Sequence, residues 1–188
     1  MADIVLFHHA QGLRRDVIAW ADRLRADGHQ VWTPDLYEGA TFDHLEDGVT
    51  HRDTIGIGEL IRRAEAELDQ VPAGVVYAGF SMGAPTAGYF TARRAGARGA
   101  VLMHGGADPG DGWPGGVPVQ VHYAVGDPWL EPGEVEGFAD AVRASGSPIE
   151  VHAYPGDGHL FADPDGPEYD EESAELMLER ELEFLRRL

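Results

Sequence analysis

Ser81 has the sequence context of a nucleophilic serine. It lies in the segment Gly79-Phe80-Ser81-Met82-Gly83, which has the G-x-S-x-G spacing of a sharp turn between a strand and a helix. Side chains two positions to either side would collide in such a turn, which explains the two glycines. An apolar run precedes the segment and a helical pattern follows it. This context favours a catalytic serine over a chance glycine-rich turn.

Asp127 and His159 follow Ser81 in the order that a serine hydrolase of the α/β type requires. Asp127 comes directly after an expected strand at 117–125, and His159 comes after an expected strand at 149–154. We expect His159 to take the serine proton and return it to the leaving group. Asp127 would fix the imidazole tautomer and stabilise the imidazolium.

Two other acids are rivals of Asp127, because Asp157 and Asp163 lie close to His159 in sequence. At two and four residues from the histidine in one loop, they are more typical of turn formers or solvated charges. Asp127 is therefore the preferred third member of the triad.

Two backbone N–H groups are candidates for binding a developing oxyanion. One belongs to Met82, the residue after the nucleophile, as is usual for this kind of turn. The other is expected in the loop after the first strand, which reads His8-His9-Ala10-Gln11-Gly12, and by its place there we choose Ala10.

Several side chains in loops at strand ends are candidates for the substrate pocket. They are His9, Gln11, Tyr37, His104, Trp129 and Phe161. Each aromatic residue could equally pack a loop onto the sheet, but together they favour an apolar acyl or aryl ester over a sugar or phosphate. No metal-ligand spacing is present, so we expect neither a metal nor a cofactor.

Short apolar runs alternate with helical patterns along the chain. Strands are expected at 4–7, 30–33, 74–79, 100–103, 117–125 and 149–154, helices at 15–26, 54–68, 84–95, 134–144 and 171–188, and a loop at 35–52. Apolar strands that alternate with helices predict a mostly parallel sheet with helices on both faces. We therefore expect one α/β domain over 1–188, with about six strands and the compact α/β-hydrolase fold.

The composition excludes several classes of function. The 188 residues carry 33 acidic and 14 basic side chains, for a net charge of −19, and all the basic residues are arginine. Such a field repels nucleic acids and anionic membranes. Without lysine or cysteine there is no Schiff-base chemistry and no thiolate. With no signal-peptide pattern, we expect a cytoplasmic monomer or homodimer that acts on a small-molecule ester or lactone.

The sequence resembles the dienelactone hydrolase family of α/β hydrolases over most of its length. The resemblance rests on His8–Gly12, Pro34-Asp35-Leu36-Tyr37, Gly79–Gly83, Gly126-Asp127 and the segment from Tyr154 to Phe161, followed by Pro164, Tyr169-Asp170 and Ala174. It implies a compact hydrolase that cleaves lactones or esters without a cofactor.

Three residues depart from the founding members of that family. Ser81 stands where they have a cysteine, and His9 aligns with a glutamate near the nucleophile. Asp163 stands where they have an arginine that binds the substrate carboxylate. We expect Asp163 to repel anionic substrates, so that neutral short-chain esters are preferred over carboxylated ones.

Two alternatives remain open at this point. The chain could be a non-catalytic binding protein that keeps the hydrolase fold, because a fold does not fix a function. It could also hydrolyse thioesters or other acyl groups, because the same triad and oxyanion hole serve all acyl transfer.

Overall fold

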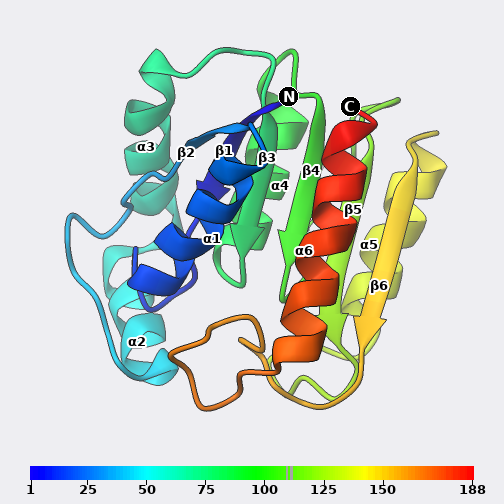
Figure 1. Ribbon diagram of the computed structural model, residues 1–188. Coiled ribbons are helices and arrows are strands. Elements are labelled where there is room, and N and C mark those ends of the chain that lie inside the picture. The colour runs from blue at the N-terminus through cyan, green and yellow to red at the C-terminus, as the bar shows by residue number, and fades with distance from the viewer. Residues whose placement is uncertain (109, 111) are drawn as a thin grey trace.

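The computed structural model describes residues 1–108, 110 and 112–188 (Figure 1). Its strands form one six-stranded parallel sheet in the order β2-β1-β3-β4-β5-β6. The strands are β1 (Asp3–Phe7), β2 (Gln30–Trp32), β3 (Val76–Phe80), β4 (Gly99–Met103), β5 (Val119–Ala124) and β6 (Ile149–Tyr154). The helices are α1 (Arg15–Ala26), α2 (Leu45–Ile55), α3 (Ile57–Glu67), α4 (Gly83–Arg93), α5 (Glu134–Ala144) and α6 (Glu171–Arg186), with a 3₁₀ turn at Leu68–Gln70. The predicted parallel α/β fold is confirmed.

Both faces of β1, β3 and β4 are buried, which explains why these strands read as continuous apolar runs. Alternate residues of β1 point to opposite faces, so Ile4 and Leu6 pack under α1 and α6. Val5 and Phe7 pack on the other side, under α3, α4 and α5. Figure 1 shows α1 and α6 in front of the sheet and α4 and α5 behind it.

The prediction of a loop at 35–52 and a helix at 54–68 was wrong in one respect, because α2 occupies Leu45–Ile55. Gly56 separates α2 from α3 with a φ of 85°, a left-handed conformation that ends a helix. The sequence of α2 gave little sign of a helix, because it buries only Gly48 and most of its side chains are polar. Tertiary contacts, described below, hold this helix in place.

The carboxyl ends of the strands lie at the lower edge in Figure 1, beside α2 and the loop that precedes α6. Open α/β sheets bind their ligands at this edge. Within the described part of the chain, no helix is long and apolar enough to cross a bilayer.

Candidate active site

The turn between β3 and α4 holds Ser81 in a strained conformation with a φ of 50°. Its N–H donates to the carbonyl of Met103 on β4 at 2.8 Å, which ties the turn to the neighbouring strand. A Cβ on Gly79 would overlap the carbonyl of Gly83, and a Cβ on Gly83 would overlap that of Phe7. The two glycines therefore permit the close approach of backbone that this turn needs.

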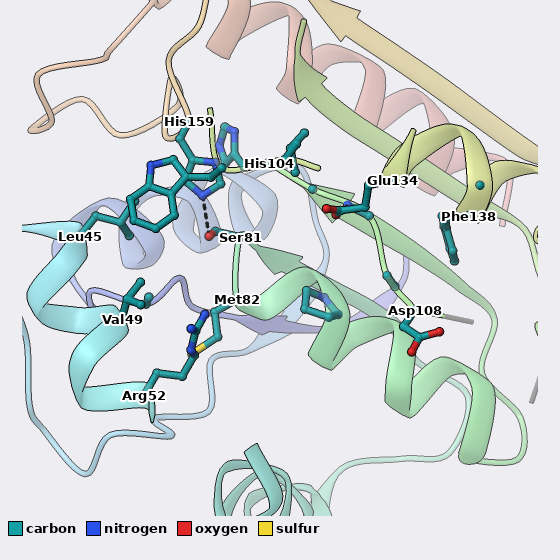
Figure 2. A pocket seen from close by; sticks show the side chains of 18 of the residues that line it. Leu45, Val49, Arg52, Ser81, Met82, His104, Asp108, Glu134, Phe138 and His159 are labelled. Atoms are coloured by element: carbon teal, nitrogen blue, oxygen red, sulfur yellow. Dashed lines mark hydrogen bonds between the residues drawn. The ribbon is translucent and has the colours of Figure 1, made fainter. Parts of the chain in front are cut away.

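Ser81, His159 and Asp127 form a continuous chain of hydrogen bonds. Ser81 Oγ lies 2.7 Å from His159 Nε2 (Figure 2). His159 Nδ1 lies 2.7 Å from Asp127 Oδ2. The other carboxylate oxygen, Oδ1, accepts from the N–H of Trp129 at 2.9 Å, so both oxygens of Asp127 are held. His159 and Asp127 are buried, whereas Ser81 is partly exposed. In this arrangement the imidazole can accept the serine proton while the carboxylate fixes its orientation.

The two rival acids lie elsewhere. Asp157 is exposed, and Asp163 accepts a hydrogen bond from the N–H of Asp165 at 2.9 Å. Asp163 does not line the cavity beside Ser81, and burial raises the pKa of its carboxyl above the ordinary value. Asp163 instead borders a smaller cavity of about 190 Å³, which shares Leu45 and Trp129 with the cavity at Ser81. The expected repulsion of anionic substrates by Asp163 stays a prediction.

Ala10 and Met82 both border the cavity beside Ser81. Their N–H groups donate to no acceptor among the described residues. Met82 precedes the first turn of α4, where free N–H groups and the helix dipole favour negative charge. The two groups are thus free to donate to an oxygen that carries developing charge.

The cavity at Ser81 has a volume of about 600 Å³. Of the predicted pocket residues, His104 and Trp129 line it. Sequence reasoning missed the contributions of α2 and α5, which are Leu45, Val49, Arg52, Glu134 and Phe138. The i, i+4, i+7 spacing of the three α2 residues was the available signal. Figure 2 shows these three side chains along one side of the cavity.

His9 and Gln11 do not line this cavity and instead hold the loop after β1 in place. His9 Nε2 lies 2.8 Å from a carboxylate oxygen of Asp16, and its Nδ1 accepts from the N–H of Gln11. The Gln11 amide donates to the carbonyl of Asp43 at 3.0 Å, just before α2. Their placement differs from the prediction because both side chains satisfy polar partners away from Ser81.

Tyr37 and Phe161 also lie behind the cavity wall. The Tyr37 hydroxyl donates to the carbonyl of Gly48 at 3.2 Å and contacts the sulfur of Met82 at 3.3 Å. Burial raises the pKa of Tyr37 to about 12, so it remains a hydrogen-bond donor. Phe161 packs edge-on against His104, with ring centroids 4.5 Å apart. Both residues support the site from outside the substrate space.

His104 is a strained and buried histidine at the end of β4. Its φ is 59°, and neither ring nitrogen has a hydrogen-bond partner among the described residues. Burial, followed by the charge of nearby His159, holds the pKa of His104 well below its ordinary value. The ring is therefore neutral, and its one donor and one acceptor are both buried.

A parallel sheet with a serine on the turn after β3, and an aspartate and a histidine after β5 and β6, defines the α/β-hydrolase class of fold. Within that class, the chain belongs to the dienelactone hydrolase family, which it matches over residues 2–188. It is thus a member of a hydrolase family. No protein of curated function matches the sequence significantly.

Solved structures show the same fold. A dienelactone hydrolase-like promiscuous phosphotriesterase from metagenomic libraries is 23% identical, with a TM-score of 0.84 over 100% of this chain and 87% of that one. A phospholipase/carboxylesterase from Dyadobacter fermentans is 19% identical, with a TM-score of 0.62 over 96% and 90%. A carboxylesterase from Bacillus cereus is 18% identical, with a TM-score of 0.59 over 95% and 88%.

Proposed function

We propose that this protein is a serine hydrolase that cleaves small ester or lactone substrates through an acyl-enzyme, within a single α/β-hydrolase domain. The observation that carries this proposal is the unbroken chain from Ser81 Oγ through His159 to Asp127, with 2.7 Å at both links. Its nucleophile borders a cavity that is large enough for a small organic molecule.

The reaction begins when Ser81 Oγ attacks the ester carbonyl carbon while His159 Nε2 takes the hydroxyl proton. The carbonyl oxygen becomes an oxyanion, which the N–H groups of Ala10 and Met82 stabilise. When the intermediate collapses, the bond to the leaving oxygen breaks and His159 Nε2 gives that oxygen its proton. The acyl group then remains on Ser81.

Water completes the cycle by the same steps. His159 removes a proton from a water molecule, which attacks the acyl carbon, and Ser81 Oγ leaves and regains its proton from Nε2. Asp127 remains ionised and stabilises the imidazolium in both halves. A serine hydroxyl is harder to deprotonate than a thiol, so this chain depends on His159 more than a cysteine enzyme would.

The experiment is to measure hydrolysis of p-nitrophenyl acetate by the wild-type protein, Ser81→Ala and Ser145→Ala. Ser145 is a suitable control because its hydroxyl donates to the carbonyl of Val142 at the end of α5, away from the cavity. Turnover should disappear in Ser81→Ala and persist in Ser145→Ala.

Turnover that survives in Ser81→Ala would contradict the proposal. If folded wild-type protein binds esters without hydrolysing any, the non-catalytic alternative is correct. A panel of esters, lactones and thioesters then identifies the acyl group that the enzyme prefers.

A further inference from the structure

A second cavity adjoins the one at Ser81. It has a volume of about 630 Å³ and lies between α3 and the outer side of α4. Arg52, Met82, Pro85 and Asp108 line both cavities, so the two spaces are neighbours along this border. We call this second space the distal compartment. A molecule bonded to Ser81 can extend into it without crossing the protein core.

The distal compartment combines apolar walls with charged side chains of both signs. Ile57, Ile61 and Tyr89 supply the apolar surface, and Ile57 is 60% exposed. An exposed isoleucine and an aromatic ring beside a catalytic cavity are suited to cover a hydrocarbon chain.

Two arginines border the far part of this compartment, and they differ in their contacts. Arg62 donates two hydrogen bonds to the carboxylate of Glu59, at 2.7 and 2.6 Å, and this carboxylate occupies the Nε–Nη2 edge of the guanidinium. Arg93 instead lies over the ring of Tyr89, with 4.2 Å from Cζ to the ring centroid. Stacking orients the guanidinium and leaves its N–H edge able to bind a carboxylate.

The position of His159 indicates which part of a substrate enters the distal compartment. The leaving oxygen must reach His159 Nε2 to receive its proton, so the leaving group lies on the histidine side of Ser81. Figure 2 shows Met82 and Arg52 on the opposite side of Ser81 from His159. The acyl group therefore extends past Met82 towards the distal compartment.

The length of α4 sets the length of that acyl chain. From Gly83 to Arg93 the helix rises about 15 Å, at about 1.5 Å per residue. The arginine side chain points back towards the helix N-terminus and shortens the gap by several ångströms. With C–C bonds of about 1.5 Å in a zigzag, a chain of roughly ten carbons covers the remainder.

We propose that the distal compartment binds the acyl chain of esters with about ten carbons that end in a carboxylate, and that Arg93 binds this carboxylate. The proposal rests on the proposed hydrolase function and adds the substrate class. It departs from the expected preference for neutral esters. It rests on the position of Arg93 and not on an excess of positive charge, because Glu65 and Asp108 border the distal compartment together with Arg52, Arg62 and Arg93.

The test compares three substrates: p-nitrophenyl acetate, p-nitrophenyl decanoate and the mono-p-nitrophenyl ester of decanedioic acid. The wild-type protein should hydrolyse the carboxylated ester with a kcat/KM about tenfold above that of decanoate, the usual size of one charge-assisted hydrogen bond. In Arg93→Gln this ratio should fall to about one. Taking the ratio within each variant cancels a general loss of activity.

A second variant tests the apolar wall. Ile57→Glu places a carboxylate in the compartment and should lower kcat/KM for both ten-carbon esters relative to acetate. Leu176→Glu is the matched control, since Leu176 is an exposed residue of α6 on the other face of the sheet. It should leave all ratios as in the wild type.

A ratio of one or less in the wild type, or a ratio unchanged in Arg93→Gln, would overturn the inference. If acetate is hydrolysed through Ser81 and only the chain preference is missing, the hydrolase function stands and the distal compartment has another role. If the folded wild type hydrolyses none of the three esters, both proposals are wrong.

Discussion

Gly48 of α2 lies against Ala10, so close that a Cβ on Gly48 would overlap the Ala10 carbonyl oxygen. Helix α2 thus packs directly on the loop that carries one of the two proposed oxyanion donors. The Tyr37 hydroxyl, which donates to the Gly48 carbonyl, also holds the helix in place. A glycine inside a helix lowers the stability of the helix by about 1 kcal/mol relative to alanine. The close approach of α2 to Ala10 explains why a glycine is nevertheless present at position 48.

Gly48→Ala should therefore reduce activity, although alanine is the better helix former. The methyl group must push α2 and the Ala10 loop apart, and losing one oxyanion donor costs about 10²–10³ in rate. The measurement is kcat for p-nitrophenyl acetate per folded molecule, with folding checked by circular dichroism.

Gly58→Ala is the matched control for helix propensity, because nothing lies within 4 Å of a Cβ there. It should raise the free energy of unfolding by about 0.5–1 kcal/mol. Wild-type kcat in Gly48→Ala would show that the position of α2 does not matter for the oxyanion site.

Asp127→Asn should lower kcat by up to about 10⁴, with a small change in KM, because an amide can donate to His159 and stabilise the wrong tautomer. The control is Asp157→Asn, which changes the exposed neighbouring acid. It should keep at least half of the wild-type kcat. Equal losses in the two variants would mean that the 2.7 Å contact of Asp127 with His159 has no special role.

Glu181 makes the stability of the fold depend on pH. It is fully buried on α6, where Trp20 Nε1 donates to its Oε2 at 2.8 Å. Burial raises the pKa of Glu181 to about 7, above its ordinary 4.5. The folded protein thus holds this proton more tightly than the unfolded chain, and stability falls as the pH rises from 4.5 to 7.

Glu181→Gln should remove this loss and stabilise the protein at pH 8 by at most about 3.5 kcal/mol, since the pKa rises from 4.5 to about 7 on folding and one pKa unit is about 1.4 kcal/mol. Urea unfolding at pH 5 and pH 8 measures the effect. The control is Glu175→Gln, which breaks an exposed ion pair with Arg23 and should change stability by less than about 1 kcal/mol. If the free energy of unfolding of Glu181→Gln depends on pH as it does in the wild type, other groups cause the pH dependence.

The sequence predicted the features that depend on local spacing and chain order. From the spacing of apolar residues, the bounds of α1, α5 and β6 were predicted as the structure has them. The turn at Ser81 and the order of Ser81, Asp127 and His159 follow from which residues come after each strand. Parallel strands end at one edge, so these three side chains had to lie near one another.

Side-chain directions and weak helices could not be predicted in this way. His9 is next to Ala10 in the sequence, yet its ring points to Asp16 on α1. Asp16 is seven residues away, so the spacing of nearby residues does not reveal this contact. Helix α2 depends on its contact with Ala10, which no local pattern encodes. Because this helix was not predicted, the spacing of Leu45, Val49 and Arg52 was not recognised as one side of a helix that faces the cavity.

The central claim, that Ser81 is the nucleophile of an acyl-enzyme mechanism, is tested most directly by covalent labelling with a fluorophosphonate. Mass spectrometry of the intact and digested protein should show one adduct per chain, located on Ser81. The adduct should be absent from Ser81→Ala and strongly slowed in Asp127→Asn. Well-folded wild-type protein that takes no label, or labelling that persists in Ser81→Ala, would contradict the claim.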